Sequence, residues 1–387
     1  MLDSLTDALS NSFDMFWEIL WALILGFAIS AVIQAVVSRR ELARLLPDDS
    51  PRSLATATVM GAASSSCSYA AVAIARSLFR KGGDFTAAIV FEFASTNLVV
   101  ELGIIMAILL GWQFTLAEFI GGPVMIVALA LFFRIFLKRR LVEAARAQAN
   151  RGRAGLMEGH AQMDMSVRGG PLLRRIFSQK GMTSTSHYFY MDWASVWRDI
   201  ALGLLIAGAL AAWVPESFWQ SLFLGGGLAA RVWGPLIGPA VSLISFVCSI
   251  GNVPLAVVLW NGGISFGGVI SFIFADLIIL PILNIYRKYY GMRMSLFLLV
   301  GSYVSMVIAG FVIEALFGVL GLIPEKRGLS TVFAGISPNY TTVLNAAFLA
   351  LALAMLVRFL RTGGIGMLKM MNQPEMQPEV PAQEHRA

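Results

Sequence analysis

Charged residues are scarce in this chain, and their scarcity sets the class of protein. They make up 13% of the 387 residues, whereas soluble domains carry about 25%. Hydrophobic residues make up 57%, and the mean hydropathy is +0.74. A soluble fold could not bury so many apolar runs of about 20 residues. The composition therefore predicts an all-α polytopic membrane protein, with the lipid bilayer as its surroundings.

Cysteine and histidine are also rare. Two cysteines are too few for a disulfide framework, and three histidines are too few for a zinc-protease helix. The chain has no G-x-x-x-x-G-K-[ST] loop for nucleotide phosphates. Its net charge of +6 comes largely from loops between apolar runs, which is a topology signal and not a nucleic-acid-binding one. We expect no enzyme activity, no cofactor and no nucleic-acid partner.

Seven apolar runs are long enough to predict membrane spans. They cover about 15–38, 85–110, 114–137, 196–214, 264–284, 294–319 and 340–360. Basic residues follow the first, third, fifth and last of these runs, which places those ends in the cytoplasm. The N-terminus would then lie outside, the C-terminus in the cytoplasm, and the protein in a bacterial inner membrane.

Two further apolar segments, about 54–80 and 235–261, are interrupted by polar residues around a cysteine, and they belong to an internal repeat. With a shift of 181 residues, twelve of the 31 positions in 64–94 are identical to their partners in 245–275. The basic residues give the two copies opposite orientations. This pattern predicts two inverted-topology repeats, each with a re-entrant helical hairpin, as in many secondary transporters.

The repeat also predicts how the chain is divided. The expected parts are a first membrane repeat (1–137), a basic cytoplasmic loop (138–192), a second, inverted membrane repeat (193–320), one extra C-terminal span (321–362) and a disordered cytoplasmic tail (363–387). The tail is rich in Pro and Gln, which favours disorder.

The stretches "SSSCSY" and "CSIGNVP" are the expected hairpin tips. Broken backbone is tolerated at membrane depth only where protein or a wet cavity surrounds it. Inverted repeats would bring the two tips together, so Cys67 and Cys248 should approach one another. The predicted substrate-binding residues are Cys67, Cys248, Ser64, Ser66, Ser68, Asn97 and Asn252. The alternative is that the cysteines and serines only let helices pack closely.

Three acids lie within the predicted spans that follow the two hairpins. Glu92 and Asp276 each lie in the span that follows a hairpin, and an acid at mid-membrane usually faces a cavity or a partner. Both are candidates for proton coupling or cation contact, with structural pairing as the alternative. Glu101 lies nearer the outer end of its span and is the weaker candidate.

The basic loop contains "MEGHAQMDM", with His160, Met163 and Met165. Imidazole and thioether groups suit soft or borderline metals such as copper. The segment is therefore a candidate for metal capture, together with the two cysteines; the alternative is a flexible linker.

The hairpin motifs and the spans after them resemble the predicted permease family that includes ArsP. The resemblance covers about residues 15–360. It rests on Cys67-Ser68, Lys81-Gly82, Ala94-Ser95-Thr96-Asn97, Cys248-Ser249-Ile250-Gly251-Asn252-Val253-Pro254, Ala275-Asp276 and Pro281. Members of that family are associated with efflux of organoarsenicals and, in some branches, of metal ions. Many have a Cys-Ser-Cys pair where this chain has only Cys67, so at most two thiols are available here.

The sequence thus predicts a permease that exports a soft metal, metalloid or organoarsenical species by alternating access and proton exchange. A permease for a small organic or anionic solute, held by half-helix N-termini, stays open as an alternative. So do a passive channel and a membrane enzyme that uses Asp276 or Glu92 as its acid or base. A homodimer is compatible with all of these.

Overall fold

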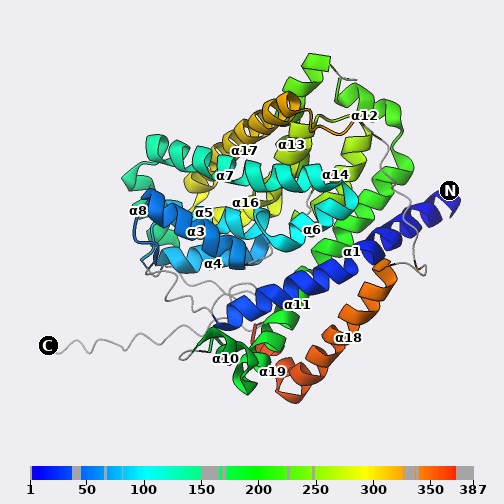
Figure 1. The fold of residues 1–387 in the computed structure, drawn as a ribbon. Helices are drawn as coiled ribbons and strands as arrows, with labels where there is room; N and C mark the ends of the chain where they lie inside the picture. The colour runs from blue at the N-terminus through cyan, green and yellow to red at the C-terminus, as the bar shows by residue number, and fades with distance from the viewer. Residues whose placement is uncertain are drawn as a thin grey trace.

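The structure is a computed structural model, and it describes most of the chain. The described residues are 2–36, 45–64, 68–80, 82–149, 165–167, 171–224, 227–245, 249–325, 327, 336 and 340–371. All regular secondary structure within them is helical (Figure 1). Six of these helical segments are long and apolar enough to cross a membrane, or seven if one bent pair counts as a span. The prediction of an all-α membrane protein is confirmed.

The first half of the chain ends in the basic segment that follows the third predicted span. Its helices are α1 (Leu2–Val36), α3 (Pro51–Ser64), α4 (Ser68–Arg80), α5 (Phe85–Asn97), α6 (Val100–Leu109), α7 (Trp112–Phe136) and α8 (Arg139–Ala149). Helices α5 and α6 together form the candidate span Phe85–Leu109. A short break at Leu98 and Val99 separates them.

The second half repeats this order. Its elements are α10 (Leu172–Phe177), α11 (Gln179–Trp213), α12 (Glu216–Leu222), α13 (Gly227–Ser245), α14 (Ser249–Asn261), α15 (Phe266–Ile273), the 3₁₀ helix η1 (Phe274–Leu277), α16 (Leu280–Tyr290) and α17 (Met292–Leu320). Two more helices follow, α18 (Tyr340–Arg361) and α19 (Gly364–Met371). The segment from α15 to α16 is the bent pair, with an angle of 41° at its break.

Helix boundaries in the two halves recur with the 181-residue shift. Helices α3 and α13 end at Ser64 and Ser245, and α4 and α14 begin at Ser68 and Ser249. The turns before α5 and α15 each use a glycine, Gly82 or Gly263, at positive φ (99° and 105°). A side chain would strain that backbone, which explains why both copies keep glycine there. The sequence repeat is therefore accompanied by matching helix ends.

The middle of each half is a fully buried helix. Every residue of α5 and every residue of α15 is buried. Helix α5 packs against α3, α4 and α7, and α15 packs against α13, α14 and α17. A Cβ on Gly61 of α3 would collide with the Phe91 carbonyl of α5, and one on Gly267 of α15 with the Gly310 carbonyl of α17. Small residues let these backbones approach closely, as is usual between membrane helices.

Helices α1 and α11 run side by side along the lower part of the molecule (Figure 1). The Ser12 hydroxyl donates to the Leu204 carbonyl at 3.0 Å, and the Gln34 amide donates to Asp192 at 2.9 Å. Helix α18 lies against both, and its Ala352 carbonyl accepts a bond from the Tyr190 hydroxyl at 2.7 Å. Most of α18 is exposed, as suits an outer span facing lipid.

Three expectations about element limits differ from the structure. The predicted span 196–214 forms the end of the much longer α11, so the expected boundary at 192/193 falls inside a helix. The expected loop 138–192 contains α8, α10 and the start of α11. The first residues of the expected tail 363–387 form α19, where Gly364 packs on the Phe359 ring. The polar and basic composition of these segments did not predict helices, because these helices gain their stability from packing against other elements.

The N-caps of α5 and α15 generate a stability prediction. The Asp84 carboxylate accepts a bond from the Ala87 N–H at 3.0 Å, and Ser265, at the matching repeat position, accepts from the Gly268 N–H at 3.2 Å. Asp84→Ala should lower the unfolding free energy by about 1 kcal/mol, whereas Asp84→Ser should be close to neutral. Thermal unfolding in detergent measures both. Glu143→Ala, at an exposed site, is the control, and equal losses for both Asp84 variants would contradict the capping role.

Candidate functional site

Asp276 is the centre of a buried polar cluster. It belongs to η1, at the break between α15 and α16, and its side chain is fully buried. One carboxylate oxygen accepts a bond from the Ser68 hydroxyl at 2.7 Å. The other accepts one from the Asn97 amide at 3.3 Å. Ser68 is the first residue of α4 and Asn97 the last of α5, so three helix ends meet at one carboxylate.

The breaks explain why polar groups gather here. The first N–H and last C=O groups of a helix have no partner within the helix. Inside a membrane such ends must find partners in the protein. Pro281 lies in the first turn of α16, where its missing N–H costs nothing. The helix N-terminus at Ser68 carries a partial positive charge, which the Asp276 carboxylate complements.

Glu92 is the second buried acid of the cluster. It lies on α5, is fully buried, and accepts a short hydrogen bond from the Tyr286 hydroxyl of α16. Its charge interacts with that of Asp276. A bond between α5 and α16 thus ties the first half of the chain to the second.

Glu118 is the third buried acid, and the sequence analysis missed it. It lies on α7 with an exposed fraction of 1%, and its charge also interacts with that of Asp276. Neither carboxylate oxygen has a hydrogen-bond partner among the described residues. The signal was present, because "TLAEFIGG" places an acid inside an apolar run. Glu118 was not singled out because its span does not directly follow a cysteine motif.

The cluster has an excess of hydrogen-bond acceptors over donors. Four buried oxygens of the cluster lack a donor among the described residues: Glu92 Oε2, Asn97 Oδ1, Glu118 Oε1 and Glu118 Oε2. In the same part of the chain, none of the three acids forms an ion pair. Charged carboxylates buried without partners are costly, and a bound proton or cation removes that cost. The arrangement is therefore suited to binding protons or a cation.

Arg76 is a buried cation in α4. Its guanidinium donates to the Ala149 carbonyl at 2.9 and 3.2 Å and stacks on the Tyr289 ring at 4.3 Å. These contacts attach α8 to the end of α4. Arg76 is thus involved in packing at that end of the molecule.

The structure brings together four of the predicted site residues: Ser68, Asn97, Glu92 and Asp276. Two others have partners elsewhere. The Ser64 carbonyl accepts a bond from Ser30 of α1 at 3.0 Å. The Asn252 amide donates to Ser242 of α13 at 3.3 Å, within the second cysteine segment.

The thiol and metal predictions fall largely outside the described residues. Cys67, Cys248 and Ser66 lie there, as do His160 and Met163 of the basic loop. Met165 is described, and its backbone bonds to the Tyr188 and Ser184 hydroxyls of α11. Across the described ranges, no group of three or more His, Cys, Asp or Glu side chains is arranged to hold a metal.

Glu101 contacts α1. It is buried at the start of α6, and its side chain covers Gly26, where a Cβ would collide with it. Its role in the structure is to pack α6 against α1, away from the contacts that surround Asp276.

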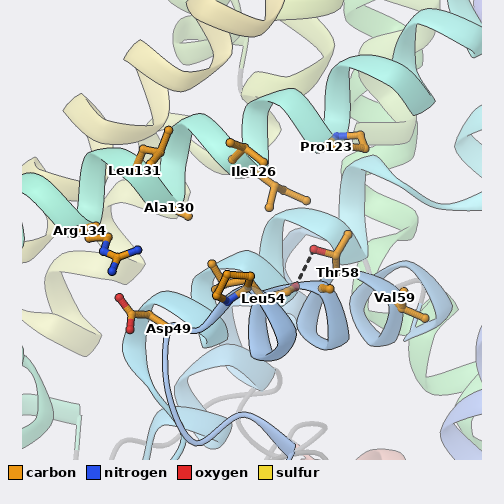
Figure 2. Close-up of a pocket in the computed structure, with 12 residues that line it drawn as sticks. Asp49, Leu54, Thr58, Val59, Pro123, Ile126, Ala130, Leu131 and Arg134 are labelled. Carbon is orange, nitrogen blue, oxygen red and sulfur yellow. Dashed lines mark hydrogen bonds between the residues drawn. The ribbon is translucent and has the colours of Figure 1, made fainter.

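A side groove runs between α3 and α7 (Figure 2). It encloses about 450 Å³ and is lined mainly by apolar side chains. Asp49 and Arg134 face each other at one end, and Pro123 lies toward the other (Figure 2).

The Pro123 end of the groove lies close to the acid cluster. The residues before Pro123, Gly121 and Gly122, pack against the side chains of Phe274 and Leu98. Leu98 follows Asn97 in the chain, and Phe274 begins the short helix that carries Asp276. Helix α7 therefore contacts, beside Pro123, two residues that adjoin members of the cluster in the chain.

Comparison with known proteins identifies the family. A family model described as a predicted permease, of the ArsP_1 type, matches residues 4–315. The chain belongs to this permease family. It is 63% identical over 338 residues to a Mycobacterium tuberculosis (strain ATCC 25618 / H37Rv) protein named "Putative permease Rv2963". The matched region covers 87% of this chain and 83% of the mycobacterial protein. No solved structure matches the chain. Membership of a permease family indicates a transporter.

The bond between Tyr286 and Glu92 can be tested by a double-mutant cycle. Tyr286→Phe should lower the unfolding free energy by about 1–3 kcal/mol, because it leaves a buried carboxyl without its donor. Adding Glu92→Leu should restore part of the loss, since both polar groups are then gone. Thermal unfolding in detergent gives the coupling free energy between the Tyr286 and Glu92 side chains.

The matched control is Tyr340→Phe. Tyr340 also donates to a glutamate, Glu18 at 3.4 Å, but at the exposed surface, so its loss should have little effect. Additive effects of the Tyr286 and Glu92 changes would show that the two side chains do not stabilise each other.

Proposed function

We propose that this permease is a secondary transporter that exports a soft metal, metalloid or organoarsenical species in exchange for protons. The observation that carries the proposal is the cluster at Asp276. Three helix ends and three buried acids meet there, with four oxygens that lack a donor among the described residues. Such a site gives cargo and protons the same binding groups, as exchange requires.

The architecture that we propose is a pair of inverted repeats with re-entrant hairpins. Helices α3, α4 and α14 have 14, 13 and 13 residues. At 1.5 Å per residue they are about 20 Å long, which is too short for a hydrocarbon core of about 30 Å. Helices α3 and α4 would form one hairpin, and α13 and α14 the other. The matching helix ends of the two halves support this arrangement.

The basic residues support an orientation for this architecture. The turn between α16 and α17 and the start of α8 carry Arg287, Lys288, Arg293, Arg139 and Arg140. By the positive-inside rule this end of the molecule faces the cytoplasm of a bacterial inner membrane, with the N-terminus outside.

Proton exchange follows from the charge balance of the cluster. A carboxylate at Asp276 attracts cationic cargo, and a proton that binds there cancels the attraction. A proton entering from the more acidic outer side would therefore release cargo to that side. Loss of the proton to the cytoplasm would restore the charge and the affinity.

The thiols supply the preference for soft cargo in this proposal. Cys67 directly precedes Ser68, whose hydroxyl bonds Asp276, and Cys248 precedes Ser249 at the matching position. Thiolates prefer soft cations over hard ones. A thiol and a carboxylate on one cargo would combine selectivity with proton coupling.

A second candidate cargo is a small organic solute, with the cysteines in a packing role. The observation in its favour is the apolar groove between α3 and α7, whose inner end lies close to the cluster. An anionic solute at the α4 N-terminus has less support, because Asp276 already occupies that position.

The thiol part of the proposal is tested with a Cys67→Ser, Cys248→Ser double variant. Cells with and without the gene are challenged with arsenicals, copper, zinc and mercury, and accumulation is measured for whichever species the parent exports. The variant should export at least about tenfold more slowly, equivalent to about 1.4 kcal/mol of lost binding. Met182→Leu, which removes a thioether at an exposed position on α11, is the control and should export like the parent. Unchanged export by the double variant would contradict the thiol site and favour the second candidate cargo, a small organic solute.

The acids are tested in proteoliposomes with an imposed pH gradient. Asp276→Asn should abolish proton movement that depends on cargo, as followed by a pH-sensitive dye inside the vesicles. Glu92→Gln and Glu118→Gln should weaken it, because each removes a carboxylate that interacts with Asp276. Glu143→Gln, at an exposed site, should behave like the parent. Gradient-driven transport by Asp276→Asn at the parent's rate would rule out coupling at this cluster.

A further inference from the structure

A second cavity lies at the basic end of the molecule. Helix α7 ends at Phe136 and the chain turns into α8, while α16 turns at Gly291 into α17. The two turns border a cavity of about 570 Å³. The Gln148 amide donates to the Lys288 carbonyl at 3.2 Å, which holds α8 against α16.

Three cations line this cavity: Lys138, Arg140 and Arg293. All three are exposed, and none of their side chains has a hydrogen bond or ion pair within the described part of the chain. Their neighbours on α8 differ. Arg139 pairs with Glu143 at 3.0 Å, and Arg146 donates to the Gly83 carbonyl and stacks on a ring.

The cavity also lacks acids among its lining residues, all of which the structure describes. Three like charges that converge without a counter-charge repel one another, and a bound anion offsets that repulsion. The charge of the cavity therefore favours a negatively charged ligand.

The apolar side chains of the lining indicate that the ligand also has an apolar part. Phe136 and Met292 line the cavity and are more than half exposed. One turn or less further along the two helices, Ile135 and Leu296 are also exposed. These side chains belong to the candidate spans Trp112–Phe136 and Met292–Leu320. The cavity thus opens where two spans reach the membrane surface, with apolar surface directly beside the cations.

We propose that this cavity binds the headgroup of an anionic phospholipid. The phosphate would contact Lys138, Arg140 and Arg293, and the first carbons of the acyl chains would lie on Phe136 and Met292. A dissolved phosphate could satisfy the cations but would leave the apolar side chains exposed. The inference does not depend on what the permease carries.

The test uses the full-length protein purified in detergent. Its thermal unfolding midpoint is measured with added phosphatidylglycerol, phosphatidylcholine or inorganic phosphate at equal concentration. Phosphatidylglycerol should raise the midpoint, and the other two should not. The variant K138Q/R140Q/R293Q should lose most of that shift.

A matched variant, R139Q/R287Q/R361Q, removes the same amount of charge from exposed positions outside the cavity. It should keep the shift. The proposal is overturned if the cavity variant keeps the shift or if both variants lose it equally. An equal shift with inorganic phosphate would assign the cavity to a free anion instead.

A second measurement needs no variant, in case the triple change prevents folding. Native mass spectrometry of the parent protein, after incubation with equimolar phosphatidylglycerol and phosphatidylcholine, counts the lipids that stay bound. Retention of phosphatidylglycerol over phosphatidylcholine is expected. Equal retention of the two lipids would show only a general lipid coat and would refute the proposal.

Discussion

The Asp276 carboxylate holds together chain segments that are far apart in the sequence. Its oxygens accept hydrogen bonds from the first residue of α4 and the last residue of α5. It lies in η1, between α15 and α16 of the bent pair. Each of these ends alone would be costly inside a bilayer, because its backbone groups lack partners. Together they supply one another with partners. The fully buried α5 and α15, with their glycine contacts to neighbouring helices, provide the rigid frame in which this is possible.

The two cavities beside this frame differ in chemistry. The groove between α3 and α7 is mainly apolar and leads toward the acids, whereas the cavity beside α8 carries three cations at the end of two spans. Three basic side chains thus gather at one end of two candidate spans, while the acids of the cluster are buried in the interior.

The sequence predicted the class and most of the spans, because hydropathy acts locally. Residue identity also indicates the internal repeat, and its inverted topology stays a prediction. It also predicted Ser68, Asn97, Glu92 and Asp276, since polar residues inside apolar runs are visible without a structure. It could not show that Ser68 reaches Asp276, 208 positions away.

The misses have the same physical cause. Asn252 matched the pattern of a site residue but bonds to Ser242 within its own half. Glu118 follows no cysteine motif, yet it is close enough to Asp276 for their charges to interact. Tyr286 was not singled out because an aromatic near a span end is commonplace. Contacts of this kind depend on how helices pack, which periodicity does not encode.

The repeat is not symmetric in its acids. At the shift of 181 residues, Asp276 is matched by Ser95 and Glu92 by Ile273, although the helix ends around them correspond. In a transporter of two equivalent inverted halves, the inward-open and outward-open forms would be mirror versions of one another with equal free energies. Unequal halves remove that degeneracy. In the transporter proposed above, one form would then be the resting state even without an ion gradient.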